Sequence, residues 1–507
     1  MNFTVRLVLA GLIAMGYSLL AVGGEPLFGS VDFLPSPQHP VGYRGDWTGR
    51  YPGAEPPATL TTSNLVWKVD VGDGEASPIV VGSRIFLLTD GIHLRCLDRE
   101  TGQWLWQRNH HVDKTDTNLW AVEEYVLARH QLRRLEAPAR DPATARTPPD
   151  PEKKAALQKQ MADLMQLDVL KNVVNLSGQW GRGGPKSYEG ALTGAVATPC
   201  SDGRAVYAWL PTGVIAVYDL AGKPLWHRVL GEKRAAGGWY GGQVAPAPLL
   251  ADNKLVIHYD KIYCLDPATG KTIWEAPRKI LPIPSPIAGQ RNGVWYITLG
   301  SGQILRLADG KYVFGEPDSS KNDYITVSTP IFYDDCFCWY THAMQLPETA
   351  DGQPKILWQL DRSSAGQLDG GAPAPDKVGK LTDPRGLGWH GYAAIVWHDG
   401  VVDYQSERSV YSRLDARTGR LLFAKPLRFA SGGGCGGEVY GGLTLAGKQI
   451  FAVSSGGGYL AVRADIGSDV TLAGESQFQY SHGKFPVFHS RRVYLHAGEW
   501  LYCFEKK

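Results

Sequence analysis

One turn-and-strand motif recurs with fixed spacing in this 507-residue chain. The sequence CLDRETGQWLW runs from Cys96 to Trp106, and CLDPATGKTIW runs from Cys264 to Trp274. Both follow the pattern D-x-x-T-G-x-x-x-W although they lie far apart in the chain. A motif that recurs in this way indicates an architectural repeat before it indicates a site.

The motif predicts a tight hairpin followed by an outer strand. An Asp side chain can accept hydrogen bonds from backbone N–H groups two or three residues on, and a Gly supplies the left-handed conformation of the turn. The Trp then fills the wedge between neighbouring repeats. A structural docking role is therefore predicted for Asp98, Gly102, Trp106, Trp226, Asp266, Gly270, Trp274, Trp358 and Trp67.

Eight related units follow one another along the chain. They start at SPIVV, TPCSDGRAVYAWL, APLLADNKLVIHY, SPIAGQRNGVWYITL, TPIFYDDCFCWY, AAIVWHDGVVDY, GLTLAGKQIFAV and FPVFHSRRVYLH. Each unit predicts short strands rich in Val, Ile, Tyr and Leu, separated by Gly, Asp and Asn turns. Four short antiparallel strands per repeat are typical of a propeller blade. We therefore predict an all-β fold, an eight-bladed β-propeller of four-stranded antiparallel blades over residues 64–507.

The eighth unit stops after three strands. The missing strand is supplied by NLVWKVDV at the other end of the repeat region, so residues 64–71 are expected to close the ring. Two insertions interrupt the blades. Residues 110–179 show helical spacing of apolar residues and predict an inserted helical hairpin, either a cap on the propeller or a partner-binding arm. Residues 361–388 are rich in Gly and Pro and predict a loop.

The N-terminus has the pattern of a secretion signal. Arg6 precedes an apolar run from Leu7 to Leu20, and small residues follow. We expect residues 1–24 to be a signal peptide, with an uncleaved membrane anchor as the alternative. No Cys follows the run, so a lipoprotein anchor is not expected, and no later segment predicts a membrane span. The protein is expected to be a periplasmic or extracellular monomer, with residues 25–63 as an extended Gly/Pro-rich lead-in.

Composition gives no general partner. The 52 basic and 50 acidic residues leave a formal charge of +2, which does not favour nucleic acid. The seven Cys residues include Cys96, Cys264 and Cys503 at matching places in different repeats, too far apart to form disulfides. They are predicted to be small buried hydrophobic side chains.

The docking motif resembles that of the pyrroloquinoline-quinone (PQQ) type propellers, a family of eight-bladed rings. The family includes quinoprotein alcohol dehydrogenases and BamB-like, non-enzymatic envelope proteins. The stretch YRGDWTGRYPGAEPP, from Tyr43 to Pro57, resembles the lead-in of secreted PQQ-like repeat proteins and predicts a loop on the ring surface. The resemblance implies the fold and leaves the activity open, because members with and without cofactor share the motif.

A site is expected where the connections between blades converge on one face around the central channel. Gly-rich segments with aromatic and charged residues precede several inner strands there. They either plug the channel or form a ligand-binding cup. The candidate ligand-binding residues are Arg182, Glu189, Trp239, Tyr240, Trp389, His390 and Glu438. Recognised catalytic and metal-binding patterns are absent from the sequence, so no catalytic or metal residue is predicted.

Two functions follow from this sequence. The first is a non-catalytic scaffold at the cell envelope that binds a secreted or envelope protein or a ligand, with no cofactor. The second is a PQQ-dependent quinoprotein oxidoreductase acting on alcohols or sugars with PQQ and Ca²⁺. The family resemblance implies that such enzymes hold PQQ between a Trp and a disulfide of adjacent cysteines, and no two cysteines are adjacent here. Trp239 or Trp389 could supply the ring, and Glu189 or Glu438 an oxygen ligand.

Overall fold

A computed structural model of the chain describes most of the repeat region and the lead-in. The described residues are 25–72, 74, 76–89, 93–109, 124–125, 128, 131–132, 135, 150–167, 197–210, 213–231, 246–278, 285–300, 302–315, 329–339, 342–359, 393–406, 410–426, 443–453, 458–463, 472–477 and 485–507.

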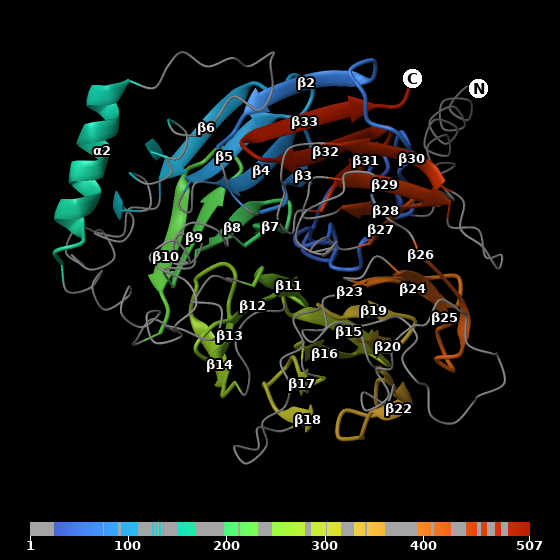
Figure 1. The fold of residues 1–507 in the computed structure, drawn as a ribbon. Helices are drawn as coiled ribbons and strands as arrows, with labels where there is room; N and C mark the ends of the chain where they lie inside the picture. The colour runs from blue at the N-terminus through green and yellow to red at the C-terminus, as the bar shows by residue number, and fades with distance from the viewer. Residues whose placement is uncertain are drawn as a thin grey trace, which may run out of the picture.

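Eight antiparallel sheets surround a central axis, and the predicted eight-bladed propeller is confirmed (Figure 1). Within a blade each strand pairs with the next one in the chain. Blades 1 to 4 are β3 (Ile79–Val81), β4 (Arg84–Thr89), β5 (His93–Asp98), β6 (Trp104–Asn109); β7 (Cys200–Ser201), β8 (Ala205–Trp209), β9 (Val214–Asp219), β10 (Pro224–Val229); β11 (Leu249–Ala251), β12 (Lys254–His258), β13 (Ile262–Leu265), β14 (Thr272–Ala276); and β15 (Ile287–Arg291), β16 (Val294–Thr298), β17 (Ile304–Arg306), β18 (Tyr312–Phe314).

The second half of the ring repeats this order. Blades 5 to 8 are β19 (Ile331–Tyr333), β20 (Cys336–Cys338), β21 (His342–Gln345), β22 (Lys355–Gln359); β23 (Ala393–His398), β24 (Val401–Ser406), β25 (Val410–Asp415), β26 (Leu421–Pro426); β27 (Thr444–Ala446), β28 (Gln449–Val453), β29 (Gly458–Arg463), β30 (Leu472–Gln477); and β31 (Val487–His489), β32 (Arg492–Ala497), β33 (Trp500–Glu505) with β2 (Leu65–Asp70).

The N-terminal strand completes the C-terminal blade. Strand β2 pairs antiparallel with β33, with Trp67 opposite Cys503 and Asp70 opposite Trp500. The outer strand of blade 8 therefore comes from the start of the repeat region. The ring is closed by backbone hydrogen bonds between segments more than 400 residues apart.

Every outer strand carries a β-bulge at the same place. The pairing register skips one residue just before the docking position in all eight blades. A bulge adds twist and re-aims the side chain that follows it, so here it turns the docking residue toward the neighbouring blade. The skipped residues are all aliphatic: Val66, Leu105, Leu225, Ile273, Val313, Leu357, Leu422 and Ala473.

The antiparallel order gives the ring two distinct faces. The turns between first and second strands and the docking turns lie on one side, which we call the lower face. The connections from one blade to the next lie on the opposite side, the upper face. The two insertions follow β6 and β22, so both leave the ring at the upper face.

The helical insertion is described in part. Helix α2 (Pro151–Leu164) begins at Asp150, whose carboxylate accepts hydrogen bonds from the backbone N–H groups of Glu152 and Lys153. Gln160 donates to Glu124, which lies in the other half of the predicted hairpin. Most of that half and all of the loop insertion 361–388 lie outside the described residues. Along the described part of the chain, no helix has the length and apolarity to cross a membrane.

The lead-in does not lie only on the ring surface, and that expectation for Tyr43–Pro57 is wrong. Strand β1 (Arg50–Tyr51) pairs in parallel with β27, the inner strand of blade 7. Val41, Trp47 and Tyr51 are buried. These apolar side chains gain free energy by leaving water, and they do so beside the inner strands of blades 2 and 7. The expectation was based on Gly and Pro content, which predicts turns but does not show whether the segment lies on the surface or inside the ring.

Candidate functional site

The predicted ligand-binding set cannot be placed. Each of its seven members lies outside the described residues: Arg182, Glu189, Trp239, Tyr240, Trp389, His390 and Glu438. Two regions that the structure describes could carry a function instead. These are the central channel and the seams between blades.

A loop of the lead-in, Val41–Tyr51, fills the described part of the central channel. Val41 forms a β-bridge with Ser201 of blade 2, and the Tyr43 ring packs edge-on against Phe485 at blade 8, with centroids 5.3 Å apart. The guanidinium of Arg50 lies 4.4 Å from the ring centroid of Tyr333 in blade 5. One short segment thus contacts blades on opposite sides of the axis.

Arg44 is the polar centre of this channel loop. Its side chain is 3% exposed, and Nη2 donates to the carbonyl oxygens of Ile395 (2.7 Å) and Leu443 (2.6 Å). Those carbonyls belong to blades 6 and 7. Burial lowers the pKa of Arg44 and raises those of Tyr43 and Asp46. Because a buried guanidinium is costly without partners, these two bonds hold the loop at a fixed depth in the channel.

Side-chain hydroxyls link the inner strands around the channel. Phe485 N–H donates to Ser77 Oγ, and Ser77 N–H donates to Thr198 Oγ1, at 2.7 and 3.2 Å. Ala247 N–H donates to Ser285 Oγ, and Ser285 N–H donates to Thr329 Oγ1, at 2.9 and 3.3 Å. All of these residues precede a Pro that begins an inner strand. The hydroxyls satisfy backbone donors that have no partner within their own blade.

The docking tryptophans join blades at the rim. The rings of Trp67, Trp106, Trp226, Trp274 and Trp358 each cover a Gly in the docking turn of the next blade. Those glycines have φ between 69° and 85°: Gly102, Gly222, Gly270, Gly310 and Gly419. A Cβ built on Gly270 would lie 2.7 Å from the Trp226 ring. The glycines thus supply both the left-handed turn and the space for the indole.

Each docking indole also makes the same hydrogen bond. The Nε1–H groups of Trp67, Trp106, Trp226, Trp274 and Trp358 donate to the carbonyls of Arg99, Leu220, Pro267, Leu307 and Ala416. The distances are 2.9 to 3.3 Å. Within the turns, Asp98 accepts from the backbone N–H groups of Glu100 and Thr101, and Asp266 from that of Thr269. Hydrogen bonds from Thr101 lower the pKa of Asp98.

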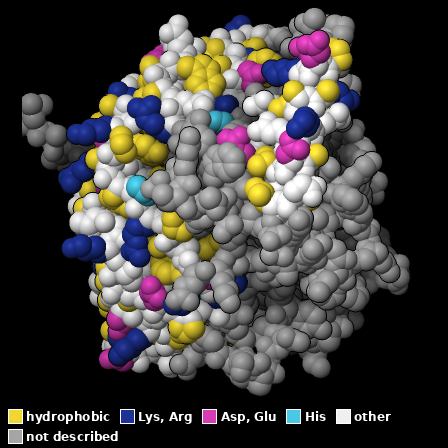
Figure 2. Space-filling view, turned by 90° about the vertical axis from the view of Figure 1, so that its left-hand side faces the viewer, with side chains coloured by type: hydrophobic (Ala, Val, Ile, Leu, Met, Phe, Trp, Pro, Cys, Tyr) yellow, Lys and Arg dark blue, Asp and Glu magenta, His cyan; other side chains and the backbone are white. Residues whose placement is uncertain are grey.

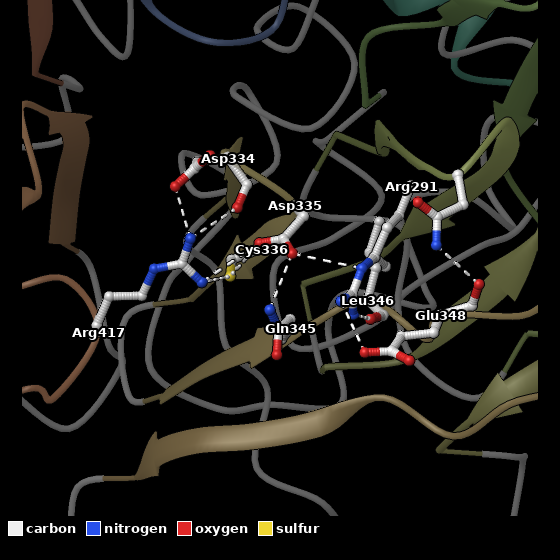
Figure 3. A network of polar contacts seen from close by, with 9 residues as sticks. Arg291, Asp334, Asp335, Cys336, Gln345, Leu346, Glu348 and Arg417 are labelled. Carbon is white, nitrogen blue, oxygen red and sulfur yellow. Dashed lines mark hydrogen bonds and ion pairs between the residues drawn. The ribbon is translucent and has the colours of Figure 1, made fainter.

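The seam between blades 4 and 5 uses ion pairs in place of a Trp. Figure 3 shows Asp335 of blade 5 between Arg291 of blade 4 and Arg417 of blade 6. Arg291 also donates to the carbonyl of Leu346 and pairs with Glu348 at 3.3 Å. The longer blade 5 loop that carries these acceptors reaches back over blade 4, whose outer strand ends in Phe314.

Blade 6 buries a charged network beside its docking position. Arg413 forms a two-pronged ion pair with Asp403 at 2.7 and 3.0 Å, and His398 Nε2 lies 2.6 Å from the same carboxylate. Arg413 stands where blades 1 and 3 have Cys96 and Cys264. Its guanidinium lies 5.3 Å from the ring centroid of Phe423, which replaces the docking Trp. The smaller ring of Phe423 is thus paired with the longer, charged side chain of Arg413.

At the seam between blades 7 and 8, the lead-in takes the place of a docking ring. Gly474 occupies the docking position of blade 7, and a Cβ there would meet Thr59 Oγ1 and the Ala58 carbonyl. Leu60 N–H donates to Ser476 Oγ at 2.7 Å. Residues 58–60 therefore pack at the docking position, where five of the other blades have a Trp and blades 4 and 6 have a Phe. The sequence signal was the absence of Trp from the seventh unit.

The cysteines that the structure describes are buried, and no disulfide joins any of them: Cys96, Cys200, Cys264, Cys336, Cys338 and Cys503. Burial raises the pKa of Cys96, Cys264 and Cys503 to about 12, so these thiols are poor nucleophiles. No group of three or more His, Cys, Asp or Glu side chains suited to a metal ion occurs within the described ranges.

The residues in the described part of the channel do not fit a PQQ site. The channel loop occupies the space on the axis, and Arg44 already donates to two backbone carbonyls. Cys200, which lies against the ring of Trp47 at Gly42, has no adjacent Cys in the sequence. A planar cofactor would have to lie outside the space that this loop occupies.

The ring of eight sheets, the docking turns and the closing strand define a PQQ-like β-propeller. A family model described as outer membrane protein assembly factor BamB matches residues 211–507, and the chain belongs to this family. No curated protein matches the chain.

Solved structures share the fold at low sequence identity. A quinohemoprotein alcohol dehydrogenase from Pseudomonas putida HK5 has 13% identity and a TM-score of 0.52, covering 93% of this chain and 80% of its own. A europium-containing methanol dehydrogenase has 12% identity and a TM-score of 0.50, covering 89% and 88%. BamB from Moraxella catarrhalis has 11% identity and a TM-score of 0.48, covering 87% and 97%. At this identity the two dehydrogenases show the fold alone.

Proposed function

We propose that the protein is a secreted or periplasmic, non-catalytic propeller that serves as a protein-interaction or ligand-binding scaffold at the cell envelope. One observation carries the proposal. The channel loop is held by Arg44 to blades 6 and 7 and fills the described space on the axis of the ring. That space therefore has a structural role. In a scaffold, function then falls to the surfaces of the ring, where the loops between blades are free to vary.

Family membership supports the kind of partner. The matching family is described as an assembly factor for outer membrane proteins. We therefore propose an envelope protein as the partner and the upper face as its binding surface. The alternative remains a quinoprotein that oxidises alcohols or sugars with PQQ and Ca²⁺, its cofactor held above the channel loop.

The two functions differ in a direct binding experiment. The purified protein is titrated with PQQ and Ca²⁺ in a calorimeter and assayed for dye reduction with alcohols and sugars. A scaffold gives no binding at micromolar cofactor and no turnover. Saturable binding with turnover would overturn the proposal.

A second experiment asks what the aromatic side chains of the upper face do. The double variant Trp239→Ala/Trp389→Ala is compared with the wild type in thermal unfolding and in capture of envelope proteins. Lost capture with an unchanged melting temperature supports a binding surface. A lower melting temperature with capture retained identifies the two rings as a plug. The variant Trp104→Ala, which removes an exposed rim Trp, is the matched control.

A further inference from the structure

The most exposed aliphatic side chains of the described chain lie in one short stretch of the lead-in. Leu27, Val31 and Leu34 are 59%, 61% and 67% exposed, whereas other exposed aliphatic residues reach 52% at most. Isolated exposed aliphatic residues need no explanation. Three exposed aliphatic residues within eight positions of one segment form a patch that can mark an interaction site.

The patch is presented on a rigid base. Between its members, Phe28 and Phe33 turn inward and pack edge-to-face with centroids 4.9 Å apart, and Phe28 also contacts Tyr51. The Phe28 carbonyl accepts from Gly53 N–H at 2.9 Å, and the Gly29 carbonyl from Ser490 N–H at 2.6 Å. The aromatic residues of this segment thus pack against the propeller, and its aliphatic residues are exposed to solvent.

The patch lies on the lower face, opposite the proposed binding surface. Its segment contacts the first turns of blades 8, 1 and 2 through Ser490, Gly82 and Gly203. Exposed basic residues adjoin these turns: Arg204, Arg491, Lys506 and Lys507. The nearby carboxylates are Asp32, Glu25 beside His39, Asp202, which accepts from the Arg204 N–H at 2.9 Å, and Glu55, which lies 3.6 Å from Lys506. Arg204, Arg491 and Lys507 have no ion-pair partner among the residues that the structure describes.

We propose that the lower face binds the surface of a lipid bilayer, with Leu27, Val31 and Leu34 inserted among the headgroups. Exposed aliphatic side chains beside Lys and Arg are the combination that holds proteins at anionic membrane surfaces. The three basic residues without an ion-pair partner in the described chain complement the negative charge of such a surface. This inference is independent of what the upper face binds.

Vesicle flotation tests the proposal with two matched triple variants of the exported protein. Leu27→Ser/Val31→Ser/Leu34→Ser removes the patch. Leu105→Ser/Leu225→Ser/Ile273→Ser removes three rim aliphatic residues that are 48%, 52% and 47% exposed. With vesicles of phosphatidylethanolamine and phosphatidylglycerol, we expect the first variant to bind about tenfold more weakly than the wild type. The rim variant is expected to stay within twofold.

Two further measurements locate the surface that binds the vesicles and the charges that contribute to binding. Hydrogen exchange with vesicles is expected to protect residues 25–36 and not β6, β10 or β14, whether or not residues 1–24 are still attached. The variant Arg204→Glu/Arg491→Glu/Lys507→Glu is expected to lose the salt-sensitive part of binding. Absent vesicle binding, equal losses in both triple variants, or a patch-dependent dimer in sedimentation would each overturn the proposal.

Discussion

At the scale of single residues, each seam with a docking Trp depends on a Gly, which has no Cβ atom. Gly270 has a φ of 69°, and the Trp226 ring occupies the space that a side chain at residue 270 would need. The same arrangement recurs at Gly102 beneath Trp67. A β-carbon at either position therefore meets two separate penalties, one from the backbone and one from the indole.

Gly270→Ala is predicted to lower the free energy of unfolding by about 2–4 kcal/mol. The left-handed backbone costs about 1 kcal/mol, and displacement of the Trp226 ring adds about 1–3 kcal/mol. Chemical denaturation measures the loss. Gly293→Ala is the matched control, because Gly293 has a φ of 80° and its Cβ would meet nothing within 4 Å. Equal losses in the two variants would show that the indole contact contributes nothing.

At the scale of secondary-structure elements, the seams are not equivalent. Five are joined by a Trp on a Gly, the seam between blades 4 and 5 uses ion pairs, and that between blades 7 and 8 uses the lead-in. At the seam between blades 6 and 7, Phe423 replaces the Trp beside the Arg413–Asp403 pair buried within blade 6. The seam between blades 8 and 1 adds a polar cluster to its Trp. There Arg99 Nη1 lies 2.9 Å from Nε2 of His489, and Arg492 pairs with Glu100 at 2.6 Å.

This closing seam is predicted to weaken as the pH falls from about 6.5 to 4.5. Burial, then Arg99 and Arg492, lowers the pKa of His489 to about 4, so the folded state binds its proton less readily than the unfolded chain. The stabilisation is complete above the unfolded pKa and is lost on acidification, with a slope of at most about 1.4 kcal/mol per pH unit. Melting temperatures across this range should change less in His489→Gln. The variant His39→Gln, on an exposed His, should match the wild type.

The channel loop is predicted to depend on Arg44. Arg44→Met keeps the apolar stem but leaves the Ile395 and Leu443 carbonyls without their donor, at a cost of about 3 kcal/mol. Arg50→Met is the matched control. The Arg50 guanidinium lies over the Tyr333 ring, an interaction of about 1 kcal/mol. Denaturant unfolding of both variants provides the comparison, and an equal loss would contradict the role of Arg44.

At the scale of the whole molecule, the ring depends on the pairing of β2 with β33. Replacing residues 64–71 with a Gly/Ser linker of equal length is predicted to lower the melting temperature by about 3 °C or more, because blade 8 then lacks its outer strand and the Trp67 contact. The size follows from a loss of about 3 kcal/mol or more at about 1 °C per kcal/mol for a ring of this length. Adding the sequence 64–71 after Lys507 through a short turn should restore most of the loss. An unchanged melt in the linker variant would contradict closure by this strand.

The fold could be predicted from the sequence because its signals are local and repeated. The spacing of Asp98, Gly102 and Trp106 encodes a turn, a left-handed residue and an outward ring, all within one hairpin. The Nε1–H bond to the next blade could not be predicted, since its acceptor is a backbone carbonyl that any residue supplies. The burial of the channel loop could likewise not be predicted, because the partners of Arg44 lie about 350 and 400 positions away in the sequence. The candidate residues of the upper face, such as Trp239, remain predictions.

The pairing of β2 with β33 also sets an order in time. During synthesis, the first strand of the ring emerges at residue 65, and its partner is complete only at residue 505. Until then Val66 and its neighbours present an unpaired strand edge, which is the kind of surface that chaperones and proteases engage. A product cut short by even its last blade cannot close. The ring thus distinguishes a finished chain from an unfinished one without any separate signal.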